Sequence, residues 1–128
     1  MEGSGTTSEA VRVEGASGGP YPLSNKIIDG NITGQYTGVD VIKLINADST
    51  IVAGNRLDAY ATYAVISSRR TGTNGITHGG YIYNNQINAQ AQNIKGIYAE
   101  VNTVPTYIGI NDIRNNGSGL RVDDSTSG

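Results

Sequence analysis

Short runs of alternating apolar and polar residues recur along the chain. Five segments begin with a small residue, followed by an apolar residue, any residue, and an apolar or small residue. Because alternate side chains of a strand point to opposite faces, this alternation predicts five short strands, each with one buried face. The segments begin at Ala10, Gly38, Ala64, Gly96 and Gly119. We expect the buried face to hold Val11, Val13, Val39, Val41, Ile97, Ala99, Leu120 and Val122, with Ser67 interrupting it.

A second pattern lies between these segments: an apolar residue, two residues of any type, Asn, any residue, and an apolar residue or Thr. It places Asn31, Asn55, Asn85 and Asn111 at separations of 24, 30 and 26 residues. The two series interleave in strict order, with a unit of about 27 residues, and such a period is typical of solenoids. Each unit contains three strands, one at the first pattern, one just before the Asn and one just after it. The pattern therefore predicts an all-β fold, a right-handed parallel β-helix of about four to five coils with three short strands per coil.

The recurring Asn has a physical reason to stand at a corner of each coil. Asn tolerates the bent backbone of a sharp corner, and its amide carries both a donor and an acceptor. Coils stack about 4.8 Å apart, a spacing at which amides of successive coils hydrogen-bond to one another. We expect the four Asn to form such a ladder, although Asn is also a common turn residue and 13 are present.

The composition excludes several classes of function. The chain has no Cys, Trp or Phe, so disulfides and Cys-based zinc sites are excluded. His78 is the single His, and no EF-hand loop is present, so we expect no metal and no cofactor. Nine basic and eleven acidic residues, with no basic run longer than Arg69-Arg70, argue against a nucleic-acid partner. No apolar stretch approaches the roughly 20 residues that span a bilayer, so membrane insertion is not expected.

The composition also divides the chain. Residues 1–9 are expected to be an added leader or a flexible tail, residues 10–123 the β-helix domain, and residues 124–128 a second flexible tail.

The three-stranded coil with Asn at one corner resembles the right-handed parallel β-helix of the pectate-lyase-like superfamily. The lack of Cys and the abundance of Gly, Asn, Tyr and Ile look most like bacteriophage tailspikes. In that family the segments GVDV, AVIS, GIYA and GLRV would be the first strand of the coil. The resemblance implies a homotrimer, bacterial surface polysaccharide as the partner, and a place in the virion tail or outside the cell. The small number of coils and the open sheet edges suggest a fragment of a longer solenoid or edges covered by partner subunits.

Glycan chemistry on such a scaffold would need a pair of carboxylates. Aligning the first strands gives one outward column of Arg12, Asp40, Ile66, Tyr98 and Arg121, and a second of Glu14, Ile42, Ser68, Glu100 and Asp123. This alignment places Glu100 and Asp123 on adjacent strands about 5 Å apart, as candidate catalytic acids. Tyr98 and Arg121 stand beside them as candidate substrate-binding residues. Ordinary solvated surface is the alternative interpretation of the four residues.

Asp40 is a further candidate contact to substrate on the same face. The alignment puts it about 12 Å from Glu100, too far for a paired hydrolase site, and next to Arg12, with which it would form an exposed ion pair. The eight Tyr supply all the aromatic surface. They could contact sugars or pack at an interface between subunits.

The leading hypothesis is a scaffold and glycan-recognition segment of a tailspike-like β-helix, in an oligomer. The first alternative is a segment of a polysaccharide hydrolase, lyase or epimerase that uses Glu100 and Asp123. The second alternative is a structural spacer without a ligand.

Overall fold

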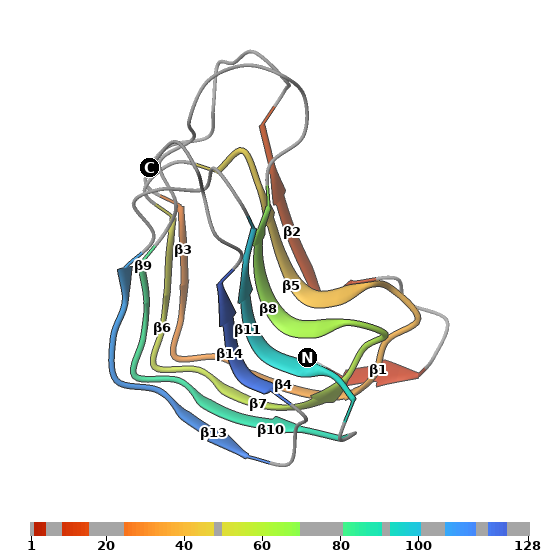
Figure 1. Ribbon diagram of the computed structural model, residues 1–128. Coiled ribbons are helices and arrows are strands. Elements are labelled where there is room, and N and C mark those ends of the chain that lie inside the picture. Colours follow the sequence, from red (N-terminus) through yellow and green to blue (C-terminus); the bar gives the residue numbers. More distant parts are fainter. Residues whose placement is uncertain are drawn as a thin grey trace.

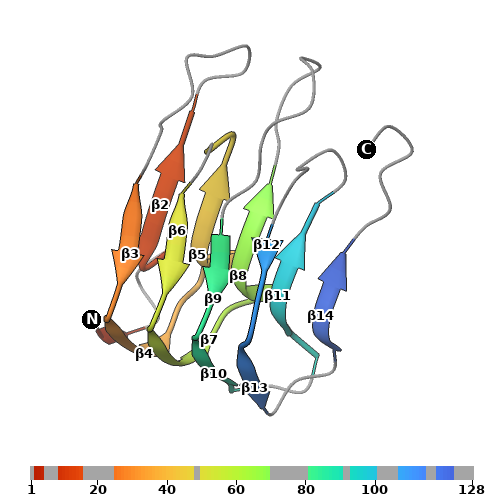
Figure 2. The same ribbon diagram turned by 90° about the vertical axis from the view of Figure 1, so that its left-hand side faces the viewer.

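The computed structural model of the chain contains three parallel β-sheets and describes residues 2–4, 9–15, 25–47, 50–69, 81–90, 93–100, 107–114 and 118–122. Each sheet takes one strand from every coil, and we call the sheets B, C and A in the order in which each coil of the chain visits them (Figure 1). The strands of successive coils lie side by side along the stack (Figure 2). We call one strand level of a sheet a rung, and the residues at one position in successive rungs a column.

The strands are short and pair only with strands of adjacent coils. Sheet A contains β1 (Glu2–Ser4), β4 (Asn31–Gln35), β7 (Arg56–Tyr60), β10 (Gln86–Ala89) and β13 (Asp112–Arg114). Sheet B contains β2 (Val11–Glu14), β5 (Asp40–Ile45), β8 (Ala64–Arg69), β11 (Lys95–Ala99) and β14 (Ser118–Val122). Sheet C contains β3 (Lys26–Ile28), β6 (Ile51–Ala53), β9 (Tyr81–Tyr83) and β12 (Tyr107–Ile108). The sequence-based prediction of an all-β parallel β-helix with three strands per coil is confirmed.

The core consists of columns of aliphatic side chains that face the inside of the solenoid. In sheet C, Val52 and Ile82 lie in one inward column, and in sheet A, Leu57 and Ile87 lie in another. Each of these four side chains is at most 1% exposed. Because each coil encloses only a narrow interior, Ile, Val, Leu and Ala fill it without large rings. This explains how a chain without Phe or Trp forms a core.

The corner between sheets C and A holds a ladder of three Asn side chains. The amide of Asn55 donates to Oδ1 of Asn85 at 3.0 Å, and the amide of Asn85 donates to Oδ1 of Asn111 at 3.0 Å. The backbone N–H groups donate in the same direction. The N–H of Asn55 donates to Oδ1 of Asn85 and the N–H of Asn85 donates to Oδ1 of Asn111, both at 3.1 Å. The predicted ladder is therefore present in three coils.

The prediction that Asn31 belongs to this ladder is wrong. Asn31 pairs with Arg56 in the sheet, so the corner position of the first coil is Gly30, whose N–H donates to Oδ1 of Asn55 at 2.9 Å. The first coil carries its apolar residues at Ile27 and Ile32, one position earlier than the pattern suggested. The Ile27-Ile28 pair had concealed this shift.

Sheet B bends along its length, and the bend shifts the predicted register. The strands β5 and β8 curve visibly (Figure 1), and their pairing passes from Asp40–Ala64 to Ile42–Ile66 without a pair between Val41 and Val65. At this bend two consecutive residues of each strand face the interior, Val41 and Ile42 in β5 and Val65 and Ile66 in β8, and all four are fully buried. The period-2 alternation is lost in these strands, which is why sequence alignment placed β5 three residues and β8 one residue out of register.

The corrected register changes the predicted faces. Val39 lies in the turn before β5 and is 42% exposed instead of buried. Ile42, Ile66 and Ser68 are buried and belong to inward columns, so their assignment to outward columns is wrong. Val11 and Val13 are half-buried, Val41, Ile97 and Ala99 are buried, and the side chains of Leu120 and Val122 lie outside the described residues. The first outward column instead contains Arg12, Lys43, Ser67 and Tyr98, and the second contains Glu14, Ile45 and Arg69.

The segment expected to be a leader or tail contains a strand. Its residues 2–4 form β1 and pair with β4. Among the described residues, no helix is long and apolar enough to cross a membrane.

Candidate functional site

The outer face of sheet B carries a cluster of charged and aromatic side chains at the bend. Asp40 is fully buried and accepts hydrogen bonds from Ser67 Oγ at 2.7 Å and from Arg69 Nε at 2.6 Å. A second guanidinium nitrogen of Arg69, Nη2, donates to the other oxygen of Asp40 at 3.0 Å, so the pair is bidentate. Arg69 follows Ser67 by two residues on β8, which brings both donors to the same face.

Two tyrosine rings enclose the Arg69 guanidinium. The ring centroids of Tyr63 and Tyr98 lie 5.0 Å apart, edge to face, and Cζ of Arg69 lies 5.1 Å and 4.8 Å from them. Nζ of Lys95 lies 3.7 Å from the centroid of the Tyr63 ring. Tyr98 is only 4% exposed because Tyr63 and Arg69 pack against it. These contacts fix the two cations by cation–π attraction.

The charge of Arg69 is held by its surroundings. Burial works against the charged form, but the hydrogen bonds to Asp40 and the attraction of Asp40 and Glu100 together raise the pKa of Arg69 above its ordinary value. Asp40 and Glu100 therefore both stabilise the charge of one guanidinium. Arg69 was not among the residues singled out from the sequence, because the predicted register placed Ser68 at its position.

The structure places the predicted site residues as follows. Glu100 follows β11, and its N–H donates to the carbonyl of Ser68 at 2.9 Å. Tyr98 pairs in register with the backbone of Arg121, whose side chain lies outside the described residues, as does all of Asp123. The proximity of Glu100 and Asp123 stays a prediction. The expected pair of Asp40 and Arg12 is wrong, since Asp40 binds Arg69 while Arg12 binds Glu14 at 2.6 Å and Glu9 at 3.4 Å. The bend is the physical reason, because Asp40 lies before it and the Arg12 column continues with Lys43 after it.

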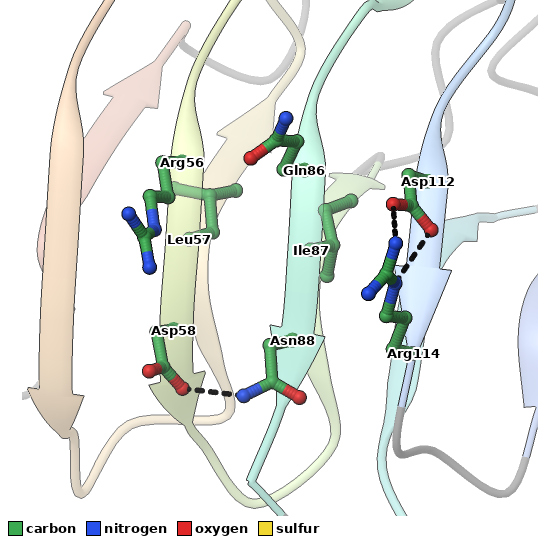
Figure 3. A pocket seen from close by; sticks show the side chains of 8 residues that line it. All are labelled: Arg56, Leu57, Asp58, Gln86, Ile87, Asn88, Asp112 and Arg114. Atoms are coloured by element: carbon green, nitrogen blue, oxygen red, sulfur yellow. Dashed lines mark hydrogen bonds and ion pairs between the residues drawn. The ribbon is translucent and has the colours of Figure 1, made fainter.

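The outer face of sheet A contains a hollow of about 350 Å³ that spans three rungs (Figure 3). One column along it is Arg56, Gln86 and Asp112, and the neighbouring column is Asp58, Asn88 and Arg114. The side chains of Leu57 and Ile87 between them face the core. Because the rungs are about 4.8 Å apart, the hollow presents polar groups at regular intervals along the stack.

Hydrogen bonds hold most of these polar side chains in place. The amide of Asn88 donates to Asp58 at 2.8 Å, and the amide of Gln90 donates to the same carboxylate at 3.2 Å. Arg114 binds Asp112 through two nitrogens at 3.0 Å and 2.6 Å (Figure 3). Among the described residues, Arg56 has no ion-pair partner and is exposed.

The ion pair in the hollow changes the titration of both partners. The hydrogen bond from Arg114 lowers the pKa of Asp112 below its ordinary value of 3.8, and the same contact raises the pKa of Arg114. Both side chains are about half exposed or more, so the pair is open to solvent and to a ligand. The hollow is lined by two arginines, two aspartates and two amide side chains.

The sequence carried a signal for this hollow that our prediction did not use. Each of the three ladder Asn residues is followed directly by a polar–apolar–polar triplet: Arg-Leu-Asp, Gln-Ile-Asn and Asp-Ile-Arg. In a parallel stack the polar members of these triplets must align on the outer face.

No group of three or more His, Cys, Asp or Glu side chains in the described part of the chain could hold a metal ion. No family model, curated protein or solved structure matches the chain.

Proposed function

We propose that the chain is a glycan-recognition segment of a tailspike-like β-helix and that it binds a bacterial surface polysaccharide in the hollow on sheet A. The observation that carries this proposal is the double column of polar side chains from Arg56 to Arg114 (Figure 3). Carboxylates, amides and guanidinium groups are the side chains that can bind neighbouring hydroxyl groups through two atoms at once. The repeat of these groups along three rungs suits a ligand that itself repeats.

The charges of the hollow favour a polysaccharide over a nucleic acid. Two basic and two acidic side chains line it, so it has no net charge. A nucleic-acid site would need an excess of Lys or Arg to neutralise phosphates. Hydroxyl groups need both donors and acceptors, and the hollow supplies both.

Binding of purified bacterial surface polysaccharides by the full chain, measured by isothermal titration calorimetry, tests this proposal. We expect Asn88→Ala and Asp58→Ala each to weaken binding about tenfold or more, since each removes a hydrogen bond of roughly 1.5 kcal/mol or more at a charged group. The control is Gln35→Ala, an exposed polar residue of the same sheet outside the hollow, which should leave the affinity unchanged. Equal losses in all three variants, or no binding by the parent chain to any polysaccharide in a broad panel, would reject the proposal.

A polysaccharide-degrading or epimerising segment is the second candidate, and one observation favours it. The negative charge of Glu100 contributes to raising the pKa of Arg69, so an acid and a cation influence each other on the face where the sequence predicted chemistry. Product release from the same polysaccharides that is abolished by Glu100→Gln, with unchanged binding, would support this candidate. Absence of product in the parent chain would leave recognition or a purely structural role.

A further inference from the structure

One arginine in the hollow on sheet A differs from the other arginines of the molecule. Among the arginines whose side chains the structure describes, Arg12, Arg69 and Arg114 each bind a carboxylate. Arg56 is exposed and binds none of the carboxylates in the described part of the chain. A single arginine of this kind is ordinary on a protein surface, but Arg56 lines a hollow whose other polar side chains are held by hydrogen bonds.

The hollow contains the same two residue types at the same spacing on two strands. Arg56 and Asp58 are separated by one residue on β7, and Asp112 and Arg114 are separated by one residue on β13. This spacing places both side chains of each strand on the outer face, about 7 Å apart along the backbone. On β13 the two side chains form a bidentate ion pair at 3.0 Å and 2.6 Å. On β7 they form none.

The amides of the next coil explain why the side chains on β7 stay apart. Asn88 and Gln90 both donate to Oδ1 of Asp58, at 2.8 Å and 3.2 Å. An exposed ion pair contributes little in solvent, so two hydrogen bonds to the carboxylate outweigh it. Figure 3 shows the carboxylate of Asp58 turned toward Asn88 on β10, and the guanidinium of Arg56 on the opposite side of β7.

The neighbours of Arg56 in its own column offer it no negative charge. Its partners in the sheet are Asn31 on β4 and Gln86 on β10, both uncharged. The guanidinium therefore keeps its fork of N–H donors for a ligand. The two amides occupy Oδ1 of Asp58, so Oδ2 of the same carboxylate offers an acceptor about 7 Å further along the strand.

We infer that the polysaccharide bound in the hollow is acidic, and that Arg56 binds the anionic group of its sugars, a carboxylate or a phosphate. The inference rests on the proposed function and adds the class of sugar to it. The planar fork of a guanidinium matches two oxygens of a carboxylate or a phosphate, whereas a neutral sugar offers it only single hydroxyl groups. The negative charge of Asp58 repels an anion, so the two residues also set a direction. The anionic group of a sugar lies at Arg56, and a hydroxyl group donates to Asp58.

Calorimetry with the full chain tests the anionic group directly. The probes are purified bacterial polysaccharides, each in its native, carboxyl-reduced and dephosphorylated forms. We expect the chain to bind an acidic polysaccharide and to lose about tenfold or more in affinity for the form without its anionic group. The treatment that causes the loss identifies the group as a carboxylate or a phosphate.

A substitution of Arg56 shows whether this residue is the partner of that group. Arg56→Gln should weaken binding of the native polysaccharide about tenfold or more, but change binding of the treated form by less than about twofold, because its partner is already gone. The control is Arg12→Gln, which removes the same charge from the outer face of sheet B and should bind like the parent chain. Circular dichroism confirms that both variants are folded.

The possible failures of the two proposals are distinguishable. Equal affinity for native and treated forms, preference for neutral polysaccharides, or an equal loss in Arg56→Gln on both forms would overturn this inference and leave recognition in the hollow standing. Absence of binding to every polysaccharide would reject the proposed function, and the inference with it.

Discussion

Asn85 is the residue on which the corner ladder depends most. It is 1% exposed, and its amide donates to the carbonyl of Val52 at 2.9 Å and to Asn111. Its own Oδ1 accepts from both the backbone and the side chain of Asn55. All four hydrogen bonds join different coils, so one side chain ties three coils together.

We expect Asn85→Ala to reduce the free energy of unfolding by about 3 kcal/mol, because the N–H of Asn55 and the carbonyl of Val52 in the preceding coil lose this partner. Chemical denaturation followed by circular dichroism measures this. The neighbouring Asn84 provides the control, since it is exposed and has a positive φ of 53°, which Gly adopts readily. Asn84→Gly should change the stability by less than about 0.5 kcal/mol. A similar loss in both variants would contradict the role assigned to the ladder.

Asp112 provides a prediction on pH. Its hydrogen bond from Arg114 lowers its pKa, so the folded state favours the charged carboxylate more than the unfolded state does. The stabilisation is therefore present above the ordinary pKa of 3.8 and is lost as the pH falls through the lower folded value. In an NMR titration we expect the Asp112 carboxyl to titrate below 3.8 in the parent and closer to it in Arg114→Gln. A titration midpoint that does not move in Arg114→Gln would show that the ion pair is absent in solution.

The residues that sequence could predict are those with a local reason for their position. The Asn corner follows from backbone preference and amide chemistry, and it was correct in three coils. Asp40 could not be assigned correctly, because its partner Arg69 lies 29 residues away and meets it only through the bend in sheet B. An alignment of the strands by position cannot show that a side chain of one column contacts a side chain of another column.

At the scale of elements, the bend in sheet B determines what β5, β8 and β11 can contain. Val41 and Val65 fill the inside of the bend, but the next coil has Gly96 at this position. A Cβ atom at Gly96 would collide with Cγ2 of Ile113 on β13 and would lie 2.8 Å from the carbonyl oxygen of Gly119. Ile113 thus occupies the space that a larger residue in β11 would take.

We expect Gly96→Ala to lower the stability by about 1–3 kcal/mol, the usual cost of overpacking a core. Ile113→Ala removes the colliding methyl groups but leaves a cavity, so it should also destabilise when made alone. The double variant should lose clearly less than the sum of the two, and a thermal or chemical denaturation cycle measures this coupling. Strict additivity would show that the two residues do not compete for the same space.

The elements themselves were predictable because period-2 alternation and turn residues are local signals. The lengths and register of the sheet B strands were not, since the bend buries consecutive residues and produces an apolar run without a period. The triplet in β9, Tyr81-Ile82-Tyr83, did keep its alternation, with Ile82 buried and Tyr81 exposed. Alternation is therefore a reliable guide where a strand is straight.

At the scale of the whole molecule, the three outer faces differ in chemistry. Sheet A is polar and hollowed, sheet B carries the buried Asp40–Arg69 pair under tyrosine rings, and sheet C is apolar. This division was not visible from composition, which averages the three faces. It appears only when the strands are grouped by sheet and their outward residues are considered apart from their inward ones, because successive residues of a strand point to opposite faces of the sheet.

The pairing of each strand with the previous and the next coil alone has a kinetic consequence. Partners in the ladders are separated by between 23 residues, as for Ile97 and Leu120, and 31 residues, as for Val11 and Ile42. Every closure during folding therefore spans one coil, however many coils a chain contains. Such a molecule can fold by winding one coil onto the last, and its rate should depend on the length of a coil more than on the length of the chain.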